Sequence, residues 1–181
     1  MENIKDLKIV KMTTLLKNKL FRWDRFCGQN NDGYKRIEKY ICLRGLRQYF
    51  QEQCQEKLEG RNQFKYVLKG EKGKILGFIC FMTYKANYRN VMYVQSIAIH
   101  PNEQHKGYGK KLIMKILDNP EKYMEATPDV VSAHVCRSNT ESYSLFRELG
   151  QKREIYPIDD VYDIIEVDYK SIKRKGESTE K

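Results

Sequence analysis

The stretch EQHKGYG, residues 103–109, combines glycine and lysine in a way that suits an anion. It follows the apolar run VQSIAIH and precedes a helical pattern, so Gly107 and Gly109 stand where a helix begins. The first N–H groups of a helix have no partner within it, and the helix dipole adds partial positive charge there. Glycines let a phosphate approach those groups closely. Three lysines add charge: Lys106, Lys110 and Lys111. The stretch therefore predicts a pyrophosphate-binding loop.

Two common phosphate-binding loops do not fit these residues. The dinucleotide-binding fingerprint GxGxxG needs a third glycine, and residue 112 is Leu. The P-loop pattern GxxxxGK[ST] is absent as well. A pair of glycines also occurs at strand ends for steric reasons alone. The elements around the loop are therefore needed to interpret it.

Those elements alternate between strand and helix patterns. Helical spacing of apolar residues predicts helices over 15–26, 34–58, 108–119 and 140–149. Asn139 suits the N-cap of the last helix, and Gly150 suits a C′ glycine at its end. Short runs rich in β-branched and aromatic residues predict strands over 7–12, 64–70, 74–84, 91–100, 129–136, 153–158 and 161–169.

Two of these segments together resemble the GNAT acetyltransferases. IAIHPNEQHKGYGKKL is similar to the family's motif A, [QR]-x-x-G-x-[GA], which here reads Gln104-His105-Lys106-Gly107-Tyr108-Gly109. VCRSNTESYSLFRELG is similar to the family's fifth strand and following helix, with Asn139, Ser142, Phe146 and Leu149-Gly150 at the family spacing. The resemblance spans residues 63–169. It implies an α+β GNAT fold, with a central, mostly antiparallel mixed sheet of six to seven strands and about four flanking helices, in the order β-α-α-β-β-β-α-β-α-β-β.

The resemblance also implies acetyl-CoA as co-substrate and a primary amine as acceptor, attacking directly in a ternary complex. By the same resemblance, the strand before the loop pairs with the pantetheine arm, the loop holds the pyrophosphate, and Phe146 lies beside the thioester. Asn139 meets the arm from the other side, although it also suits a plain helix cap. The implied cofactor-binding residues are Ile97, Ala98, Ile99, Gln104, His105, Lys106, Gly107, Tyr108, Gly109, Lys110, Asn139, Ser142 and Phe146.

A base must remove a proton from the acceptor ammonium before its nitrogen attacks. In some relatives a carboxylate five residues before the Asn does this, and that position here is His134. A histidine is a sensible substitute, and a packed strand histidine is the alternative. Tyr93 and Gln95 stand where many members carry a glutamate, and Gln95 can position a water. Alternation predicts that both share a face with Ile97 and Ile99, whose N–H groups include the expected oxyanion donor, that of Ile99.

The proton donor for the departing thiolate is the main departure from the family. Many members carry a tyrosine where this chain has Phe146. Tyr143, one turn earlier, and Tyr108, near the loop, are the nearby phenols, and neither is at the motif position. Either an enzyme without the usual general acid or a CoA-binding protein with little turnover fits this departure.

The last hairpin offers a candidate acceptor contact. Its acidic and aromatic residues could attract a cationic amine or simply form a solvated turn. Trp23 and Asp24 leave the same two alternatives. A small amine, a peptide amino terminus and a lysine side chain all fit as acceptors. The hairpin residues concerned are Asp159, Asp160, Asp163, Tyr156 and Tyr162.

Charge and length set the remaining expectations. The net charge of +10 is concentrated in residues 1–70, with 16 Lys and Arg against 8 Asp and Glu. These bases are mixed with acids, so a solvated surface is favoured over nucleic-acid binding. A basic nucleic-acid-binding module stays as an alternative function. The 181 residues predict one domain over 1–170 and a disordered tail over 171–181.

Five cysteines without a CxxC pair argue against a disulfide framework and a zinc ribbon. The three histidines include no i,i+4 pair, so no metal site is expected. The chain shows no secretory signal and no apolar run long enough for a bilayer, which predicts a protein of the reducing cytoplasm without membrane partners. A monomer and a homodimer are both compatible with the sequence.

Overall fold

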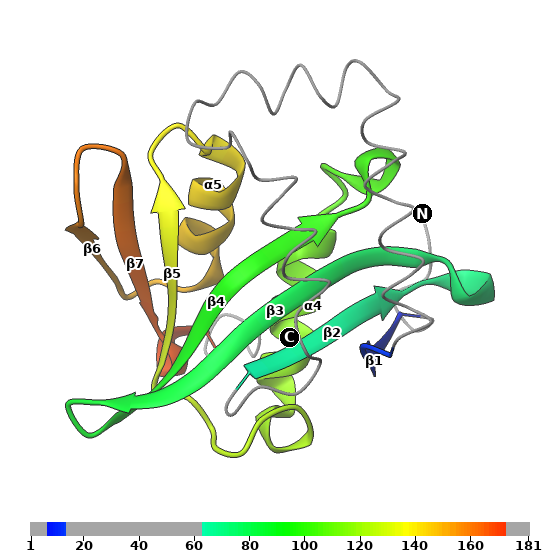
Figure 1. The fold of residues 1–181 in the computed structure, drawn as a ribbon, viewed down its shortest axis with the longest axis horizontal. Coiled ribbons are helices and arrows are strands. Elements are labelled where there is room, and N and C mark those ends of the chain that lie inside the picture. Colours follow the sequence, from blue (N-terminus) through cyan, green and yellow to red (C-terminus); the bar gives the residue numbers. More distant parts are fainter. Residues whose placement is uncertain (1–6, 14–62, 173–181) are drawn as a thin grey trace, which may run out of the picture. The chain divides into compact units, whose positions relative to one another are not determined.

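The structure is a computed structural model that describes residues 7–13 and 63–172 (Figure 1). The helices predicted over 15–26 and 34–58, and most of the basic segment, lie outside the described residues. The elements are β1 (Lys8–Lys11), β2 (Gln63–Lys69), β3 (Ile75–Ala86), β4 (Arg89–Ile99), α4 (Tyr108–Asp118), β5 (Val130–Cys136), α5 (Thr140–Leu149), β6 (Arg153–Pro157) and β7 (Tyr162–Asp168). Short 3-10 turns cover Glu71–Gly73, Pro101–Glu103 and Pro120–Lys122.

The strands form one seven-stranded sheet in the order β1-β2-β3-β4-β5-β7-β6. The pair β4–β5 is parallel, whereas β1–β2, β5–β7 and β6–β7 are antiparallel. All seven predicted strands are confirmed, and so is the expected mixed, mostly antiparallel sheet. The two helices predicted within the described residues are present as α4 and α5.

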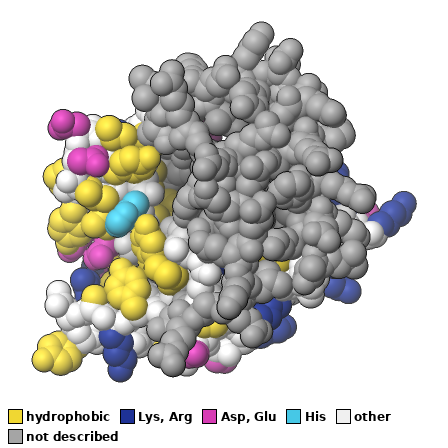
Figure 2. Space-filling view, in the orientation of Figure 1, with side chains coloured by type: hydrophobic (Ala, Val, Ile, Leu, Met, Phe, Trp, Pro, Cys, Tyr) yellow, Lys and Arg dark blue, Asp and Glu magenta, His cyan; other side chains and the backbone are white. Residues whose placement is uncertain are grey.

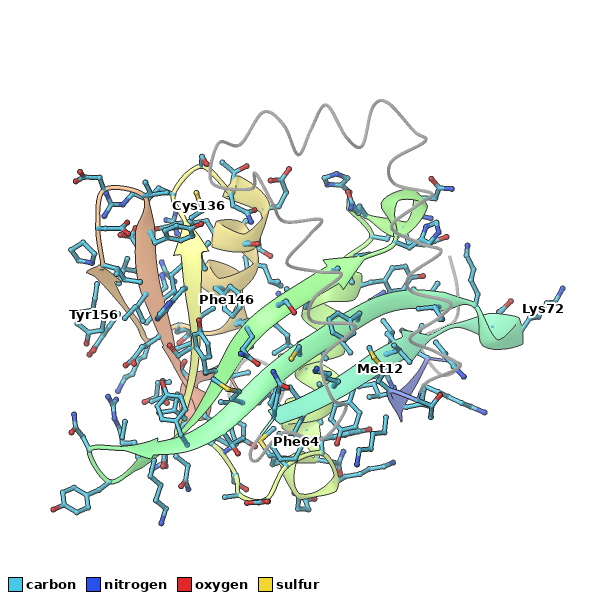
Figure 3. All side chains as sticks on the ribbon, viewed as in Figure 1. Met12, Phe64, Lys72, Cys136, Phe146 and Tyr156 are labelled. Atoms are coloured by element: carbon cyan, nitrogen blue, oxygen red, sulfur yellow. The ribbon has the colours of Figure 1, made fainter. Side chains whose placement is uncertain are left out.

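The chain divides into two compact units, residues 1–80 with 96–108 and residues 81–95 with 109–181. In the first unit, β1 pairs with β2, and Met12 packs with Val67, Phe78 and Cys80 in a buried cluster. Figure 3 shows Met12 beside β1 and β2, and Lys72 at the tip of the turn between β2 and β3. This cluster packs residues of β2 and β3 against the end of β1.

Although β3 has 12 residues and β4 has 11, the β4 side has one residue more between the turn that joins them and a hydrogen bond just beyond β4. Ala86 and Arg89 flank the two-residue turn between β3 and β4, and farther along His100 N donates to Leu76 O at 2.9 Å. Between these two points β3 advances ten residues and β4 eleven, so β4 carries a β-bulge, a feature that redirects side chains. Val94 is buried between the half-buried Tyr93 and Gln95, but Val91 and Met92 are both buried and residues 95–99 are all half-buried. The single shared face expected from Tyr93 to Ile99 is therefore not seen beyond Gln95.

In the second unit, α5 packs against β5 and β7 (Figure 1). Burial along β7 alternates, with Asp163, Ile165 and Val167 buried. On α5, Phe146 and Leu149 are the buried residues. Alternation thus gives this part of the sheet two different faces, one packed against α5 and one carrying the even-numbered residues of β7.

Gly150 ends α5 for a different reason from the one the sequence suggests. A C′ glycine adopts a positive φ, but Gly150 is extended, with φ −148° and ψ 170°. A Cβ at this position would lie 2.5 Å from Ser171 Oγ and 2.7 Å from Val167 Cγ1. Glycine is required here by close packing rather than by backbone conformation.

Cysteine chemistry also differs from the expectation. Cys80 is a buried free thiol, but Cys136 is disulfide-bonded. The sequence argued only against a disulfide framework, and it did not predict the disulfide at Cys136, because spacing in the sequence says nothing about which cysteines meet in space. Ser171 and Ile172, placed by the sequence at the start of the tail, are buried. No helix in the described segments is long and apolar enough to span a bilayer.

Candidate functional site

The glycine loop adopts the left-handed backbone conformation at two positions. Gly107 has φ +75° and His105 has φ +60°, in a region that side chains with a Cβ rarely adopt. A Cβ at Gly107 would meet no atom within 4 Å. Glycine is thus needed at 107 for conformation, and the backbone there borders open space. His105 holds a strained conformation that the sequence gave no reason to expect, and such strain is common at ligand sites.

Helix α4 begins directly after this loop, at Tyr108. Tyr108 is buried, whereas Lys106 is exposed and Lys110 is half-buried. The first turn of α4 contains no acidic residue, although an acid there would complement the helix dipole. Lys110 and Lys111 in that turn oppose the dipole instead. A helix start with this charge pattern is stabilised by an anion from outside the chain.

Ion pairs hold the loop in place. Glu103 is buried, and its carboxylate bonds to the Lys74 ammonium and, at 2.8 Å, to Lys106 Nζ. Hydrogen bonds from Lys106 and Lys74 lower the pKa of Glu103. Lys106 Nζ also donates to Asn102 O at 3.0 Å, and Gln104 Nε2 donates to Ile99 O at 3.2 Å. The sequence reading missed Glu103 and Lys74, because their pairing joins residues 29 positions apart.

The end of β4 contains a polar group that suits a ligand. Ile97, Ala98 and Ile99 are all half-buried. Just before them, the buried Ser96 hydroxyl has no hydrogen-bond partner, alone among buried side-chain polar atoms of the described residues. A partnerless hydroxyl, bare backbone at Gly107 and a basic helix start together fit a ligand with amide groups and phosphates, as coenzyme A has.

The start of α5 is closed by its own cap. Asn139 Oδ1 accepts from Ser142 N at 3.1 Å, which confirms the predicted helix cap. Glu141 in the first turn and Arg147 in the last both complement the helix dipole. Phe146 is buried at 2 % exposure on the same helix. The cap occupies the Asn139 oxygen, and its amide nitrogen is the group that would meet a cofactor.

His134 is the only exposed residue of β5. Its ring meets the ring of Tyr93 edge-on, with 5.0 Å between centroids and 66° between planes. Burial raises the pKa of Tyr93, and Tyr84 nearby adds to the shift. Gln95, two residues along β4, is half-buried. The structure therefore brings together two of the predicted catalytic residues; His134 is exposed, yet its ring packs against Tyr93, so the alternative of a packed strand histidine stays open.

Tyr143 lies on the other face of this part of the sheet. Its hydroxyl donates to Asp163, which is buried and also bonds to Arg137 Nε at 2.9 Å and Nη2 at 2.7 Å. Asp163 faces Val135 across β5–β7, one position away from His134, which faces Ile164. Successive residues of a strand point to opposite faces. Tyr143 and His134 are thus directed to opposite sides of the sheet.

Two residues of the last hairpin bond within the chain, Asp159 through its carboxylate and Asp160 through its main-chain carbonyl. Asp159 Oδ1 accepts from Val161 N at 2.7 Å and Tyr162 N at 2.6 Å, and these bonds lower the pKa of Asp159. Asp160 O accepts from Arg137 Nη1 at 3.1 Å. The turn interpretation thus accounts for Asp159, while Trp23 and Asp24 lie outside the described residues.

A row of polar and aromatic side chains shares the face of His134; Tyr156 among them was named from the sequence, whereas Glu166 and Tyr84 were missed. Glu166 faces Ser132 on one side and Glu154 on the other, and Ile164 faces His134 and Tyr156 in the next row. Glu166 pairs with Arg89 at 3.4 Å and contributes to the raised pKa of Tyr84, whose main cause is burial. Tyr156, at the outer edge of the sheet in Figure 3, is 44 % exposed. Figure 2 shows apolar side chains gathered around a histidine, with acidic side chains among them.

No group of three His, Cys, Asp or Glu side chains within residues 7–13 and 63–172 is placed to hold a metal ion.

Comparison with known proteins adds to this geometry. The acetyltransferase (GNAT) family profile matches residues 29–151. The fold is similar to that of a spermidine N-acetyltransferase from Vibrio cholerae in complex with CoA and spermine, with a TM-score of 0.58 and 13 % identity over 93 % of this chain and 99 % of that one. It is also similar to the PaiA N-acetyltransferase from Thermoplasma acidophilum in complex with coenzyme A, with a TM-score of 0.61 and 18 % identity over 90 % and 99 %. No curated protein matches the sequence significantly.

These structures show the fold alone at such low identity, whereas the family profile covers about two thirds of the chain and includes both motifs. On that match, together with the glycine loop and the capped second helix, the chain belongs to the acetyltransferase (GNAT) family.

Proposed function

We propose that the chain transfers an acetyl group from acetyl-CoA to a primary amine by direct attack in a ternary complex. The loop from Gln104 to Lys110 is the observation that carries this proposal. It presents bare backbone at Gly107 and a basic helix start, which is the arrangement that a diphosphate needs. Acetyl-CoA supplies an activated thioester carbonyl.

The loop and the end of β4 would bind the two parts of the cofactor. Backbone N–H groups at the start of α4, with Lys106 and Lys110, would hold the diphosphate. The main chain of Ile97, Ala98 and Ile99 would pair with the pantetheine arm, and the N–H of Ile99 would donate to the thioester oxygen in the tetrahedral state. The Asn139 amide and Ser142, with Phe146, would border the arm from α5.

His134 would act as the base. It is exposed and oriented by Tyr93, so its imidazole can take a proton from the ammonium directly or through a water held by Gln95. The amine nitrogen then bonds to the carbonyl carbon, the carbon–sulfur bond breaks, and the CoA thiolate leaves, while the nitrogen loses its second proton to solvent to give the neutral amide. His134 keeps the proton from the amine until solvent removes it.

The acceptor would approach across the sheet face that carries His134. Glu166 lies one strand over and two residues along from His134, a separation of roughly 8 Å. Its carboxylate and the rings of Tyr84 and Tyr93 suit a cation. The spermidine acetyltransferase neighbour, solved with spermine, makes small polyamines a rational first test. Peptide amines remain candidates in the same screen.

At the motif position, the chain lacks a side chain that can give a proton to the thiolate, which is the observation that favours an alternative function, CoA binding without turnover. Phe146 has no hydroxyl, and the Tyr143 hydroxyl is held by Asp163 on the opposite face from His134. A CoA-binding protein with little turnover follows if a general acid is essential. Thiolate is a good leaving group, so we favour an enzyme that draws this proton from solvent.

An acceptor screen with acetyl-CoA and thiol detection tests the proposal. Small diamines, polyamines and peptides are offered in turn, and one class is expected to release CoA thiol. His134→Ala should lower kcat about 100-fold or more with acetyl-CoA affinity unchanged. Tyr93→Phe, which keeps the ring against His134, is the control and should retain most activity.

CoA binding without thiol release for any acceptor supports the non-catalytic alternative. Salt-sensitive nucleic-acid binding without CoA binding supports the basic module. A cytoplasmic location, a single domain over 1–170, and a monomer or homodimer stay predictions.

A further inference from the structure

Ser96 on β4 carries a buried hydroxyl that the chain itself leaves without a partner. Within residues 7–13 and 63–172 it is alone in this respect among buried side-chain polar atoms. Buried hydroxyls are nearly always hydrogen-bonded, because a group removed from water without a new partner loses free energy. Such an atom in a strand next to a ligand loop indicates a contact made with a ligand.

The position of Ser96 identifies the part of the ligand. It belongs to the same compact unit as the glycine loop and precedes Ile97 by one residue. At about 3.3 Å per residue, Ser96 lies roughly 13 Å along the strand from His100, where the loop begins. An arm anchored by its diphosphate at the loop and extended along β4 brings its thiol-proximal amide to Ser96.

The backbone around Ser96 explains why its hydroxyl is available to a ligand. Strand β4 carries one residue more than β3 over their common length, and its pairing with β5 covers only Val91 to Tyr93. A bulge redirects side chains and interrupts a ladder. Ser96 follows the last paired residue, Tyr93, by three positions, so β4 beyond that pair is open to another hydrogen-bonding partner.

We propose that the Ser96 hydroxyl hydrogen-bonds an amide of the pantetheine arm, near its thiol end, when coenzyme A binds. This inference rests on the proposed function, because it requires that coenzyme A is the ligand of the glycine loop. Ser96 is then a cofactor-positioning residue outside both sequence motifs. It fixes the thiol end of the arm, whereas the loop fixes the phosphate end.

Titration calorimetry with Ser96→Ala tests the proposal. The variant should bind coenzyme A and acetyl-CoA about three- to tenfold more weakly, the usual effect of one hydrogen bond. It should bind adenosine 3′,5′-bisphosphate, which lacks the arm, as the unchanged protein does. Ser96→Thr keeps a hydroxyl and should restore most of the lost affinity.

Thermal unfolding of the ligand-free protein separates this role from a structural one. Removing a partnerless buried hydroxyl should leave the Tm unchanged or raise it. Ser171→Ala is the matched control, because Ser171 Oγ donates to Asp168 O at 2.8 Å. That variant should lower the Tm and leave coenzyme A binding unchanged.

Two results would overturn the inference: equal coenzyme A affinity in Ser96→Ala and the unchanged protein, or weaker binding together with a lowered Tm of the ligand-free variant, which would assign the loss to a structural role. If the unchanged protein itself fails to bind coenzyme A, the proposed function fails first. The two failures are therefore distinguishable.

Discussion

The two α-helices of the described segments begin in opposite ways. Helix α5 starts with Asn139 as a cap and Glu141 in its first turn, so its own residues satisfy its N–H groups and dipole. Helix α4 starts after a left-handed Gly107, has no acid in its first turn and carries Lys110 there. The start of α5 carries a side-chain cap and an acid, whereas the start of α4 is basic and suits an anion. The difference shows where a phosphate group fits.

A glutamate introduced at the start of each helix should give the largest difference in coenzyme A binding between the two sites. Gly109→Glu places a negative charge where the diphosphate is expected and should weaken coenzyme A binding about 100-fold or more, equivalent to about 2.7 kcal/mol. Thr140→Glu places the same side chain in the first turn of α5, where it suits the dipole. It should leave binding unchanged, as calorimetry will show. Equal losses in both variants would refute the distinction.

Substituting the cap should separate the two roles of Asn139. Asn139→Ala removes the acceptor for Ser142 N and should lower the free energy of unfolding by about 1 kcal/mol, measured by denaturant titration. Asn139→Asp keeps a capping oxygen and removes the amide donor. It should retain stability and bind coenzyme A more weakly. Normal coenzyme A affinity in the Asp variant would show that Asn139 is a cap alone.

Lowering the pH should weaken the contribution that Glu103, which holds the glycine loop before α4, makes to the stability of the fold. Its pKa lies below the ordinary value of 4.5 because of Lys106 and Lys74. A lowered pKa means that the carboxylate stabilises the fold above the ordinary value, and this contribution is lost as pH falls through the lowered one. Glu103→Gln should therefore be less stable than the unchanged protein at pH 7, with the gap closing as the pH falls through the lowered pKa of Glu103. A gap that stays constant in thermal melts across this range would contradict the assignment.

The smallest expected effect is at Lys110. Its pair with Glu148 is long, 3.9 Å, and exposed, so the pair contributes little to stability. Lys110→Gln removes a charge that opposes the dipole and should change stability by no more than a few tenths of a kcal/mol. Coenzyme A binding should weaken by roughly threefold and depend less on salt. An unchanged salt dependence would remove Lys110 from the phosphate site.

Local sequence predicted the elements and both motifs well. The seven strands, the cap at Asn139 and the helix start after Gly107 all depend on residues within about four positions of one another, where hydrogen-bonding and φ preferences act. The pattern at Gly150 predicted the helix end correctly but for the wrong reason. The need for glycine comes from Val167 and Ser171, which are distant in sequence.

The sequence by itself determined the family, the glycine loop and the chemical character of the site, because these depend on residue types at short, fixed spacing. Only the tertiary structure decided which groups meet. It paired His134 with Tyr93, directed Tyr143 to Asp163 on the opposite face, and left the Ser96 hydroxyl without a partner. Such contacts follow from strand register and one extra residue in β4, which no short-range pattern specifies.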